Sequence, residues 1–391
     1  MTANAIFVLN SGSSSLKFGV FAERDGQVRA SHRGAVEGIG AEQGKVWLRN
    51  ASGNAVREEK RAIPNQKEAA RAVAQKLSEM ALPKLDGIGH RVVHGGPSLT
   101  AHQKITPEVL QQLEAAAHFA PLHVPVALEL IRETQQLFPD VVQFACFDTA
   151  FHRTLPEAAA RLPLPGKFWE AGIRKYGFHG LSCESILHAL GPNLPPRVIV
   201  AHLGNGASLT AIAKGLSVDT SMGLTPTGGI IMGTRPGDLD PGVLLHILRG
   251  NGNNVEELER LLNKESGLLG VSGASPDMRT LHQAAQNNPQ ARLAIEMFAR
   301  SARKAVGSYV AILGGLDLLV FAGGIGEHDA AVRSLICQEL ECLGVRLDPE
   351  ANRRGAATIS AAGSLARVQV IASDEETQMA RIVFGLLDNA A

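Results

Sequence analysis

Two stretches, IFVLNSGSSSL at residues 6–16 and VIVAHLGNGASL at residues 198–209, repeat one pattern at points separated by nearly half of the 391-residue chain. Each contains an apolar strand, a polar residue, a glycine turn and a returning Ser-Leu. Laying Asn10 on His202 aligns the two glycine turns, and one extra residue in the second copy then aligns the returning Ser-Leu pairs. Such self-similarity is typical of a duplicated domain, with chance resemblance of two turns as the alternative. We therefore expect two related domains whose turns face each other across a cleft that could hold a nucleotide's phosphates.

The first turn carries more hydroxyl groups than a hairpin needs. A hairpin turn of two to five residues requires only Gly, Asn or Asp, whereas residues 11–15 read SGSSS. Gly12 would let the backbone approach a ligand, and the serines with Lys17 could bind phosphate oxygens or hydrated Mg²⁺. The alternative is a serine-rich surface turn. The segment is not a Walker A loop, because it lacks the G-x-x-x-x-G-K-[ST] spacing and runs from strand to strand.

Composition limits the classes of protein to which the chain could belong. Its 391 residues, 45% of them hydrophobic, suffice for two domains with cores of their own. The 38 basic and 38 acidic residues balance, which argues against a nucleic-acid or anionic-membrane partner. The sequence has no apolar run of membrane-spanning length and no signal-peptide pattern. The four cysteines form no CxxC pair, so a reducing cytoplasm suits them best.

Apolar segments alternate with helical ones along the chain. The runs AIFVL, RVIVAHL, LDLLVFAGG and ARVQVIAS are bounded by glycine or polar residues and are typical of buried strands. Helical periodicity predicts helices over residues 66–80, 106–117, 125–137, 254–262 and 290–313. The alternation predicts an α/β fold. The proline-rich span 152–172 predicts a loop or linker that leaves the first domain.

Two further glycine-rich segments could contact a ligand. FAGGIGEH, residues 321–328, follows an apolar strand and precedes a helix expected to begin near Asp329, where backbone N–H groups could bind a ligand. A lone GxG pattern is weak evidence. The stretch 223–242, GLTPTGGIIMGTRPGDLDPG, carries Arg235 among glycines, threonines and prolines that are poorly suited to a core. It predicts a site, with an ordinary surface loop as the alternative.

Charged or polar groups stand in four otherwise apolar segments. These groups are Arg91 in GIGHRVVHGG, Asp148 in QFACFDTAFH, His179 in YGFHG, and residues 374–376 in ASDEETQMAR. Asp148 and Glu375 could instead cap helices. His179 could be a hydrogen-bonded core residue, and Arg91 could be half of an ion pair. Together, however, arginines, a lysine, histidines and carboxylates among Ser- and Gly-rich loops are the groups that phosphoryl transfer requires.

Eight segments, in order from residue 10 to residue 376, resemble the successive signature segments of the acetate kinases: NSGSSSLKF, HRVVHGG, FDTAFH, YGFHGLS, HLGNGASL, MGTRPGDLDPG, GGIGE and DEE. Eight ordered matches are far more specific than any single one. The resemblance implies duplicated ribonuclease-H-like domains of the sugar kinase, actin and heat-shock ATPase superfamily. Residues 1–150 plus about 376–391 would form the N-terminal domain, and residues 151–375 the C-terminal domain with the main nucleotide site. The resemblance also implies a homodimeric cytoplasmic enzyme.

The resemblance further implies the catalytic residues. Asp148 matches the residue that the family has as its active site. His179 and Arg235 match its transition-state stabilisers, and Arg91 and Arg235 would flank the carboxylate and the migrating phosphoryl group.

Binding residues follow from the same matches. Asn10 and Glu375 would bind Mg²⁺, for which Mn²⁺ could substitute. Contacts to ATP and ADP would come from Lys17, Ser13, Ser15, His202, Leu203, Gly204, Asn205, Gly206, Asp277, Met278, Arg279, Gly324, Ile325, Gly326, Glu327 and His328. A small apolar pocket for the acyl methyl group would be lined by Val93, Leu122, Phe178 and Pro226.

Three segments depart from the family pattern. His328 stands where many relatives have Asn, TPTGG replaces the commoner Leu-Glu-Gly version of its loop, and SDEE replaces Thr-Asn-Glu-Glu. Because these segments adjoin the expected nucleotide and metal sites, we expect them to affect nucleotide preference and metal affinity more than the reaction class.

The expected reaction is reversible, direct in-line transfer of the ATP γ-phosphoryl group to the carboxylate of acetate, which gives acetyl phosphate and ADP. The carboxylate is ionised at pH 7 and needs no general base, so we expect Asp148 to orient an arginine or the water shell of Mg²⁺. Two unit charges about 4 Å apart repel by roughly 4 kcal/mol at an effective dielectric of 20. Paired guanidiniums, Mg²⁺ and Lys17 would offset that repulsion.

Alternative functions differ in their dependence on a carboxylic acid. A propionate or other short-chain acyl kinase is close, because one methylene is discriminated by only about 1 to 3 kcal/mol. A sugar kinase would need a carboxylate base and polar groups for hydroxyls. An actin-like or chaperone-like ATPase would not depend on added carboxylate. Trapping an acyl phosphate as its hydroxamate separates these possibilities.

Overall fold

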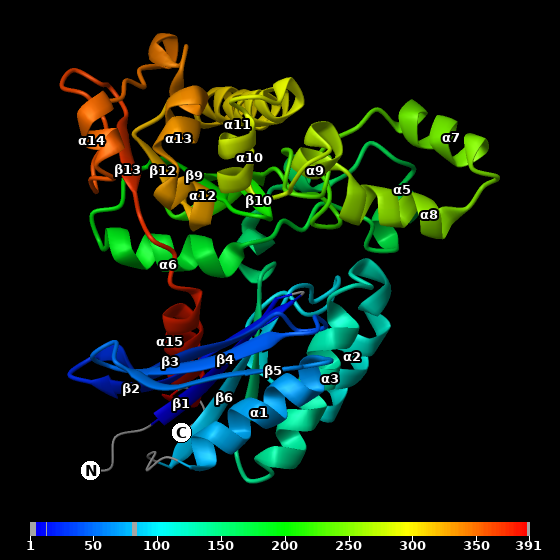
Figure 1. The fold of residues 1–391 in the computed structure, drawn as a ribbon, viewed down its shortest axis with the longest axis vertical. Coiled ribbons are helices and arrows are strands. Elements are labelled where there is room, and N and C mark those ends of the chain that lie inside the picture. The colour runs from blue at the N-terminus through cyan, green and yellow to red at the C-terminus, as the bar shows by residue number, and fades with distance from the viewer. Residues whose placement is uncertain (1–4, 13, 80–83, 389–391) are drawn as a thin grey trace. The chain divides into compact units, whose positions relative to one another are not determined.

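The computed structural model describes residues 5–12, 14–79 and 84–388, and the chain forms two compact units (Figure 1). The first unit comprises Met1–Ala150, Gly180–Ser185 and Asp374–Ala391, and the second comprises Phe151–His179 and Ile186–Ser373. The expected N-terminal domain did not include residues 180–185, which are the first half of a helix.

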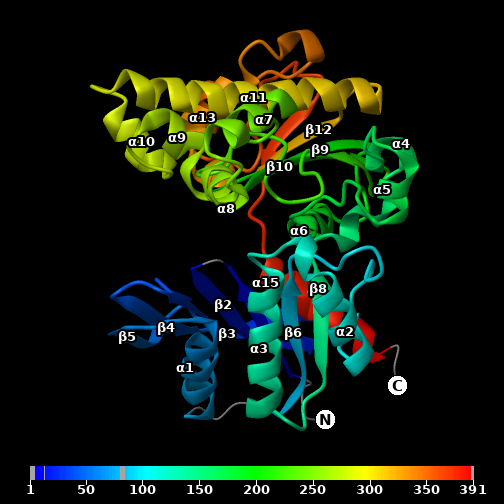
Figure 2. The ribbon, with the colours of Figure 1, turned by 90° about the vertical axis from the view of Figure 1, so that its right-hand side faces the viewer.

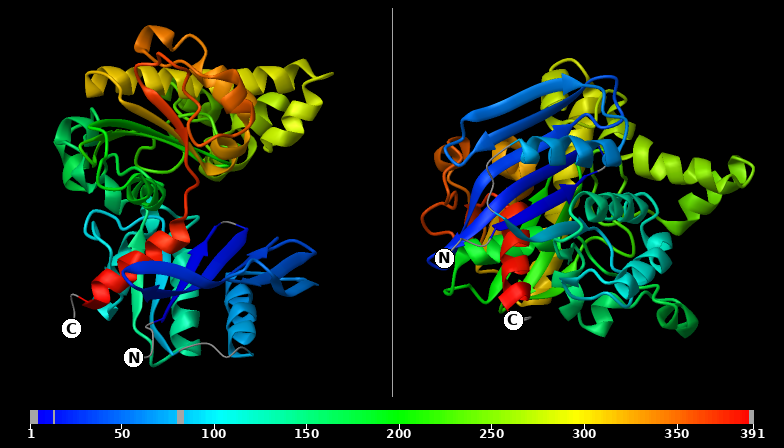
Figure 3. Two further views of the ribbon diagram at one scale, coloured as in Figure 1. Left: turned by 90° about the vertical axis from the view of Figure 1, so that its left-hand side faces the viewer. Right: turned by 90° about the horizontal axis from the view of Figure 1, so that it is seen from below.

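The first unit contains a mixed sheet with strand order β5-β4-β3-β2-β1-β6-β8-β7. Its strands are β1 (Ala5–Ser11), β2 (Ser15–Arg24), β3 (Gln27–Glu37), β4 (Gly44–Asn50), β5 (Ala55–Arg61), β6 (Leu85–Val92), β7 (Gln103–Lys104) and β8 (Gln143–Phe147). Its helices are α1 (Gln66–Ser78), α2 (Pro107–Ala115), α3 (Val124–Leu137), α15 (Glu375–Asp388) and the start of α6 (Gly180–Leu190). Helices α1 and α3 pack on one face of the sheet and α15 on the other (Figures 2 and 3). Because both faces are covered, every residue of β1 is buried.

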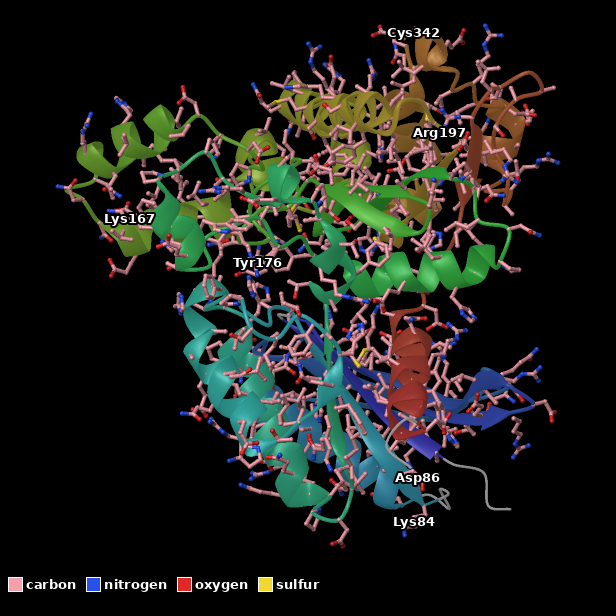
Figure 4. The ribbon with its side chains drawn as sticks, turned by 180° about the vertical axis from the view of Figure 1, so that it is seen from behind. Lys84, Asp86, Lys167, Tyr176, Arg197 and Cys342 are labelled. Carbon is pink, nitrogen blue, oxygen red and sulfur yellow. The ribbon has the colours of Figure 1, made fainter. Side chains whose placement is uncertain are left out.

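The second unit contains a sheet with strand order β11-β10-β9-β12-β13. Its strands are β9 (Arg197–Leu203), β10 (Ala207–Ala213), β11 (Leu216–Thr220), β12 (Leu318–Ala322) and β13 (Arg367–Val370). Its helices are α4 (Glu157–Ala160), α5 (Gly166–Glu170), α7 (Pro241–Gly250), α8 (Val255–Arg260), α9 (Gly267–Ser272), α10 (Met278–Ala284), α11 (Pro289–Leu313), α12 (Gly323–His328), α13 (Ala330–Cys337) and α14 (Pro349–Arg353), with the rest of α6. Arg197, at the start of β9 and labelled in Figure 4, forms an ion pair with Asp317, the residue before β12. Its Nη2 donates to Oδ1 at 2.5 Å, and its Nε donates to Oδ2 at 3.1 Å.

The two sheets repeat one topology, which confirms the predicted duplicated α/β fold. β1 pairs antiparallel with β2 and parallel with β6, and β9 pairs antiparallel with β10 and parallel with β12. One detail of the predicted alignment was wrong. Asn10 lies opposite Lys17 and His202 lies opposite Ser208, so Lys17, not Ser15, occupies the place of Ser208. The extra residue lies in the first turn, not the second.

Side-chain caps explain where the predicted helices begin. Asn65 accepts from the N–H of Glu68 at the start of α1, and Thr106 accepts from Val109 in α2. Proline occupies the first turn of α2, α3 and α11, where its missing N–H costs nothing. The five predicted helices are therefore present with ends that differ by a few residues. Among the described residues, no helix is long and apolar enough to span a bilayer.

Two segments expected to be loops contain helix. The span 152–172 includes the short helices α4 and α5. The glycine segment after β12 is itself helix α12, and Asp329 caps the next helix, α13, by accepting from the N–H of Val332 at 2.9 Å. Gly323 makes the sharp exit from β12 possible, because its φ is +74° and a Cβ there would lie 2.7 Å from the carbonyl oxygen of Leu203.

Candidate active site

Strand alternation places three polar side chains on the face of the first sheet that α15 covers. In β1 the even-numbered side chains pack toward α15, and Asn10 is the last of them. In β6 the odd-numbered positions face α15, and Arg91 is the last of them. In β8 the side chain of Cys146 packs toward α15, and Asp148, two residues later, continues on the same face. Because β1, β6 and β8 are parallel neighbours, their carboxyl ends lie at one edge of the sheet. The sequence thereby brings Asn10, Arg91 and Asp148 together.

Half-buried Arg91 and buried Asp148 form an ion pair with several bonds. Arg91 Nη2 donates to Asp148 Oδ2 at 2.6 Å, and Nε donates to the two carboxylate oxygens at 3.2 and 3.1 Å. Arg91 Nη1 donates to Asn10 Oδ1 and to the carbonyl oxygen of Ser11, each at 3.3 Å. Burial opposes the charge on Arg91, but Asp148 and Glu375 outweigh it and raise the pKa of the guanidinium. Burial raises the pKa of the Asp148 carboxyl, against the effect of Arg91. Asp148 thus fixes the plane of the Arg91 guanidinium.

The first turn of α15 adds two carboxylates to this group. Asn10 Nδ2 donates to Glu375 Oε2 at 3.1 Å and to Glu376 Oε1 at 2.6 Å. Burial raises the pKa of Glu376, with Lys17 acting in the opposite direction. Helix α15 can sit this close because β6 has glycine beneath it: a Cβ on Gly89 would lie 3.0 Å from a methyl carbon of Val383.

This cluster suits a divalent cation of the magnesium type. Carboxylate oxygens are its preferred ligands, and Mg²⁺ commonly uses one or two of them while keeping several waters. A cation would also relieve the repulsion between Glu375 and Glu376. The amide oxygen of Asn10 faces Arg91, so the carboxylates present the oxygen donors. Within residues 5–12, 14–79 and 84–388, no group of three or more His, Cys, Asp or Glu could hold a metal, so protein ligands would be few.

In the second unit, His179 and His202 form a stacked pair beside the second hairpin. Their ring centroids are 4.4 Å apart, and His179 Nδ1 lies 2.9 Å from Ser208 Oγ. Ser208 is directly opposite His202 in the β9–β10 hairpin. His179 precedes α6 with φ 60° and ψ 27°, a left-handed conformation that side-chain-bearing residues seldom adopt.

Arg235 reaches the same turn from the loop that follows β11. A Cβ on Gly206 would lie 3.0 Å from Arg235 Nη2 and 3.4 Å from His179 Nε2, so glycine allows both side chains to approach. Arg235 Nη1 donates to the carbonyl oxygen of Pro226. Burial lowers the pKa of Arg235. Among the residues that the structure describes, no carboxylate forms an ion pair with Arg235, and this suits the binding of an anion.

The other predicted nucleotide segments also lie in the second unit. Asp277 caps α10 by accepting from the N–H of Thr280 at 2.9 Å, and that bond, with others, lowers its pKa. Glu327 folds back to the start of its own helix, where Oε1 accepts from the N–H of Gly323 at 3.0 Å. Arg279 and His328 are exposed.

Several predicted contact residues point into the core instead. Phe178 is 1% exposed and contributes its carbonyl oxygen to His152. Leu203, Met278 and Gly326 are also buried, so any contact they make with a ligand would be through the backbone. Leu122 is exposed, Val93, Ser15 and Ile325 are half-buried, and Ser13 lies outside the described residues.

Two arginines hold the start of α15 and the end of α12, and neither was predicted from the sequence. Arg33 of β3 bonds to Asp374 at 2.9 and 2.6 Å, across 341 positions of the chain. Arg333 of α13 is buried and donates to the carbonyl oxygens of Gly326 and Glu327, both at 2.9 Å. No local signal distinguishes such residues from surface arginines, because their partners come from other elements.

The two repeated sheets define the duplicated fold of the actin-like ATPases. A model of the acetokinase family matches residues 5–381, and the chain belongs to that family. A propionate kinase of Citrobacter rodentium is 43% identical, with 97% of this chain and 96% of the relative covered. An acetate kinase of Campylobacter jejuni is also 43% identical, with 98% and 100% covered. The crystal structure of a propionate kinase from Francisella tularensis has a TM-score of 0.88 at 39% identity and covers 97% of this chain and 98% of that one.

Proposed function

We propose that this chain reversibly transfers the γ-phosphoryl group of ATP to the carboxylate of acetate and forms acetyl phosphate and ADP. Membership of the acetokinase family makes the chain a phosphotransferase with a carboxyl group as acceptor. The observation that supports the proposal best is the array of Asn10, Arg91, Asp148, Glu375 and Glu376 at one edge of the first sheet.

Arg91 and Asp148 would act as a unit in the transfer. Acetate is ionised at neutral pH, so no side chain needs to remove a proton from it. Arg91 would bind an anionic oxygen through its planar fork, and Asp148 would hold that fork in one plane. Asp148 is therefore proposed as a positioning residue, since both of its oxygens already accept bonds from Arg91.

Glu375 and Glu376 would hold Mg²⁺, and Asn10 would fix the two carboxylates. Bound there, the metal would screen the phosphate charge and stabilise charge that develops during transfer. Lys17, opposite Asn10 in the hairpin, adds a positive charge on the same face.

The second unit would carry the main nucleotide site. The turn from His202 to Gly206, the start of α10 and helix α12 are the proposed contacts. Arg235, which lacks a carboxylate partner within the described ranges, and His179 would stabilise the migrating phosphoryl group.

Propionate is the second candidate acceptor, because relatives named propionate kinase match this chain as closely as one named acetate kinase. The test is ATP- and Mg²⁺-dependent formation of hydroxamate from formate, acetate, propionate and butyrate. The highest kcat/KM with acetate supports the proposal, and the highest with propionate supports the alternative. ATP hydrolysis without any hydroxamate would overturn both.

We also propose a cytoplasmic homodimer that joins through α7 and α8. None of the residues in these two helices, all of which the structure describes, is buried. Val243, Leu245 and Val255 are 42%, 51% and 60% exposed. Large apolar side chains left exposed on two neighbouring helices suit an interaction site.

A further inference from the structure

Arg33 binds the residue that directly precedes helix α15. Asp374 directly precedes Glu375, and its Oδ1 accepts from the N–H of Thr377 at 3.0 Å, which is a helix cap. The same oxygen accepts from Arg33 Nη1 at 2.9 Å. The other carboxylate oxygen, Oδ2, accepts from Arg33 Nη2 and from the Thr377 hydroxyl, both at 2.6 Å.

The sheet and an aromatic ring hold Arg33 in place. It lies in β3 opposite Gly19 of β2, and its guanidinium carbon lies 5.3 Å from the ring centroid of Phe21. Its Nη2 also donates to the Thr377 hydroxyl at 2.6 Å. The guanidinium thus joins the middle of the sheet to the first turn of the helix.

Arg33 also lies near Glu376, one of the two carboxylates in the first turn of α15. Arg33 Nη1 lies 3.8 Å from Glu376 Oε2, while the other oxygen of Glu376 accepts from Asn10 at 2.6 Å. Glu376 is therefore placed between β3 and β1. A shift of the first turn of α15 would move Glu375 and Glu376 away from Asn10 together.

We propose that Arg33 is a positioning residue for the divalent cation: through Asp374 it fixes the first turn of α15, and so sets where Glu375 and Glu376 present their carboxylates. The inference rests on the proposed function for the identity of the metal site. Arg33 and Asp374 are about two-fifths exposed, and exposed ion pairs contribute little to stability. The pair therefore acts on metal affinity, as partners behind metal ligands commonly do.

The test replaces Arg33 by Met, which keeps a long side chain over Phe21 but removes the fork. Arg49→Met is the matched control. Arg49 is the residue opposite Arg33 on β4, and its guanidinium carbon lies 5.4 Å from the ring centroid of Trp47. Mn²⁺ binding in the presence of ADP is followed by the loss of the free-ion paramagnetic resonance signal.

We expect Arg33→Met to raise the Kd for Mn²⁺ and the half-saturating Mg²⁺ concentration about tenfold, with KM for acetate changed less than twofold. Arg49→Met should leave all three unchanged. Arg33→Met in an Asp374→Asn background should add little, because Arg33 acts through Asp374. A Kd for Mn²⁺ equal in Arg33→Met and Arg49→Met would overturn the inference, as would full additivity of the two substitutions. If the wild-type protein bound Mn²⁺ as described but formed no hydroxamate, the proposed function would fail while this inference held.

Discussion

At the scale of single residues, the geometry of Arg91 decides what its charge can do. Arg91→Lys would keep the charge but lose the fork that engages Asp148 and Asn10 together. We expect kcat to fall at least about 100-fold, because one ammonium cannot replace several fixed donors. Arg71→Lys is the control, since Arg71 pairs with Glu133 at 2.6 Å between α1 and α3. Steady-state hydroxamate kinetics would measure both variants, and an Arg91→Lys enzyme with wild-type kcat/KM would contradict the role.

The left-handed backbone conformation of His179 should lower the free energy of unfolding, and substitutions at this residue can measure by how much. A left-handed residue with a side chain costs roughly 1 to 2 kcal/mol relative to glycine. His179→Gly and His179→Ala both remove the ring that bonds to Ser208 and stacks on His202. We expect both to lose most activity, and the Gly variant to be more stable than the Ala variant by about 1 kcal/mol in urea denaturation. Equal stability of the two variants would show that the backbone is not strained there.

At the scale of elements, β6 and β8 share a buried polar pair on the face opposite Arg91. His90 Nε2 donates to Gln143 Oε1 at 2.7 Å, and burial lowers the pKa of His90 to about 4. His90 Nδ1 and Gln143 Nε2 have no hydrogen-bond partner among the described residues. Between pH 6.5 and pH 4 the unfolded state binds a proton that the folded state does not, so folding stability falls as the pH is lowered.

Replacing both residues, His90→Leu with Gln143→Leu, should remove this dependence. The wild type should lose roughly 2 kcal/mol more than the double variant between pH 7 and pH 4.5. Urea unfolding at the two pH values measures the difference, and other titrating groups cancel because both proteins contain them. Parallel losses in the two proteins would rule out His90 as the source.

The helices and strands also show which parts of the fold and the site could be predicted from the sequence. The apolar runs of β1 and β9 and the helical periodicity of α1 and α2 are local, so the strands, the helices and the duplication could be predicted. The convergence of Asn10, Arg91 and Glu375 could be expected only through the family resemblance. The role of Arg333 could not, because its contacts depend on how α13 packs beside α12 and α14. Helix α12 was missed because glycine, which usually ends helices, here also provides the turn from β12.

At the scale of the whole molecule, the exposed apolar side chains of α7 and α8 should determine the oligomeric state. These helices lie at the end of the second unit opposite α13 and α14 (Figure 1). In a two-fold symmetric dimer each residue of the contact occurs twice, so one substitution is felt twice. Burying one uncompensated carboxylate costs several kcal/mol, and two would weaken association by at least about 1,000-fold.

We therefore expect the wild-type chain of 41.4 kDa to have twice that mass in light scattering, and Leu245→Glu to have the mass of one chain. Leu365→Glu is the control, because Leu365 is 87% exposed yet lies outside these helices. Its dimer should persist at the same protein concentration. If Leu245→Glu stayed dimeric while Leu365→Glu dissociated, the contact would lie at the α14 end of the unit. A wild-type protein with the mass of one chain would rule out the dimer itself.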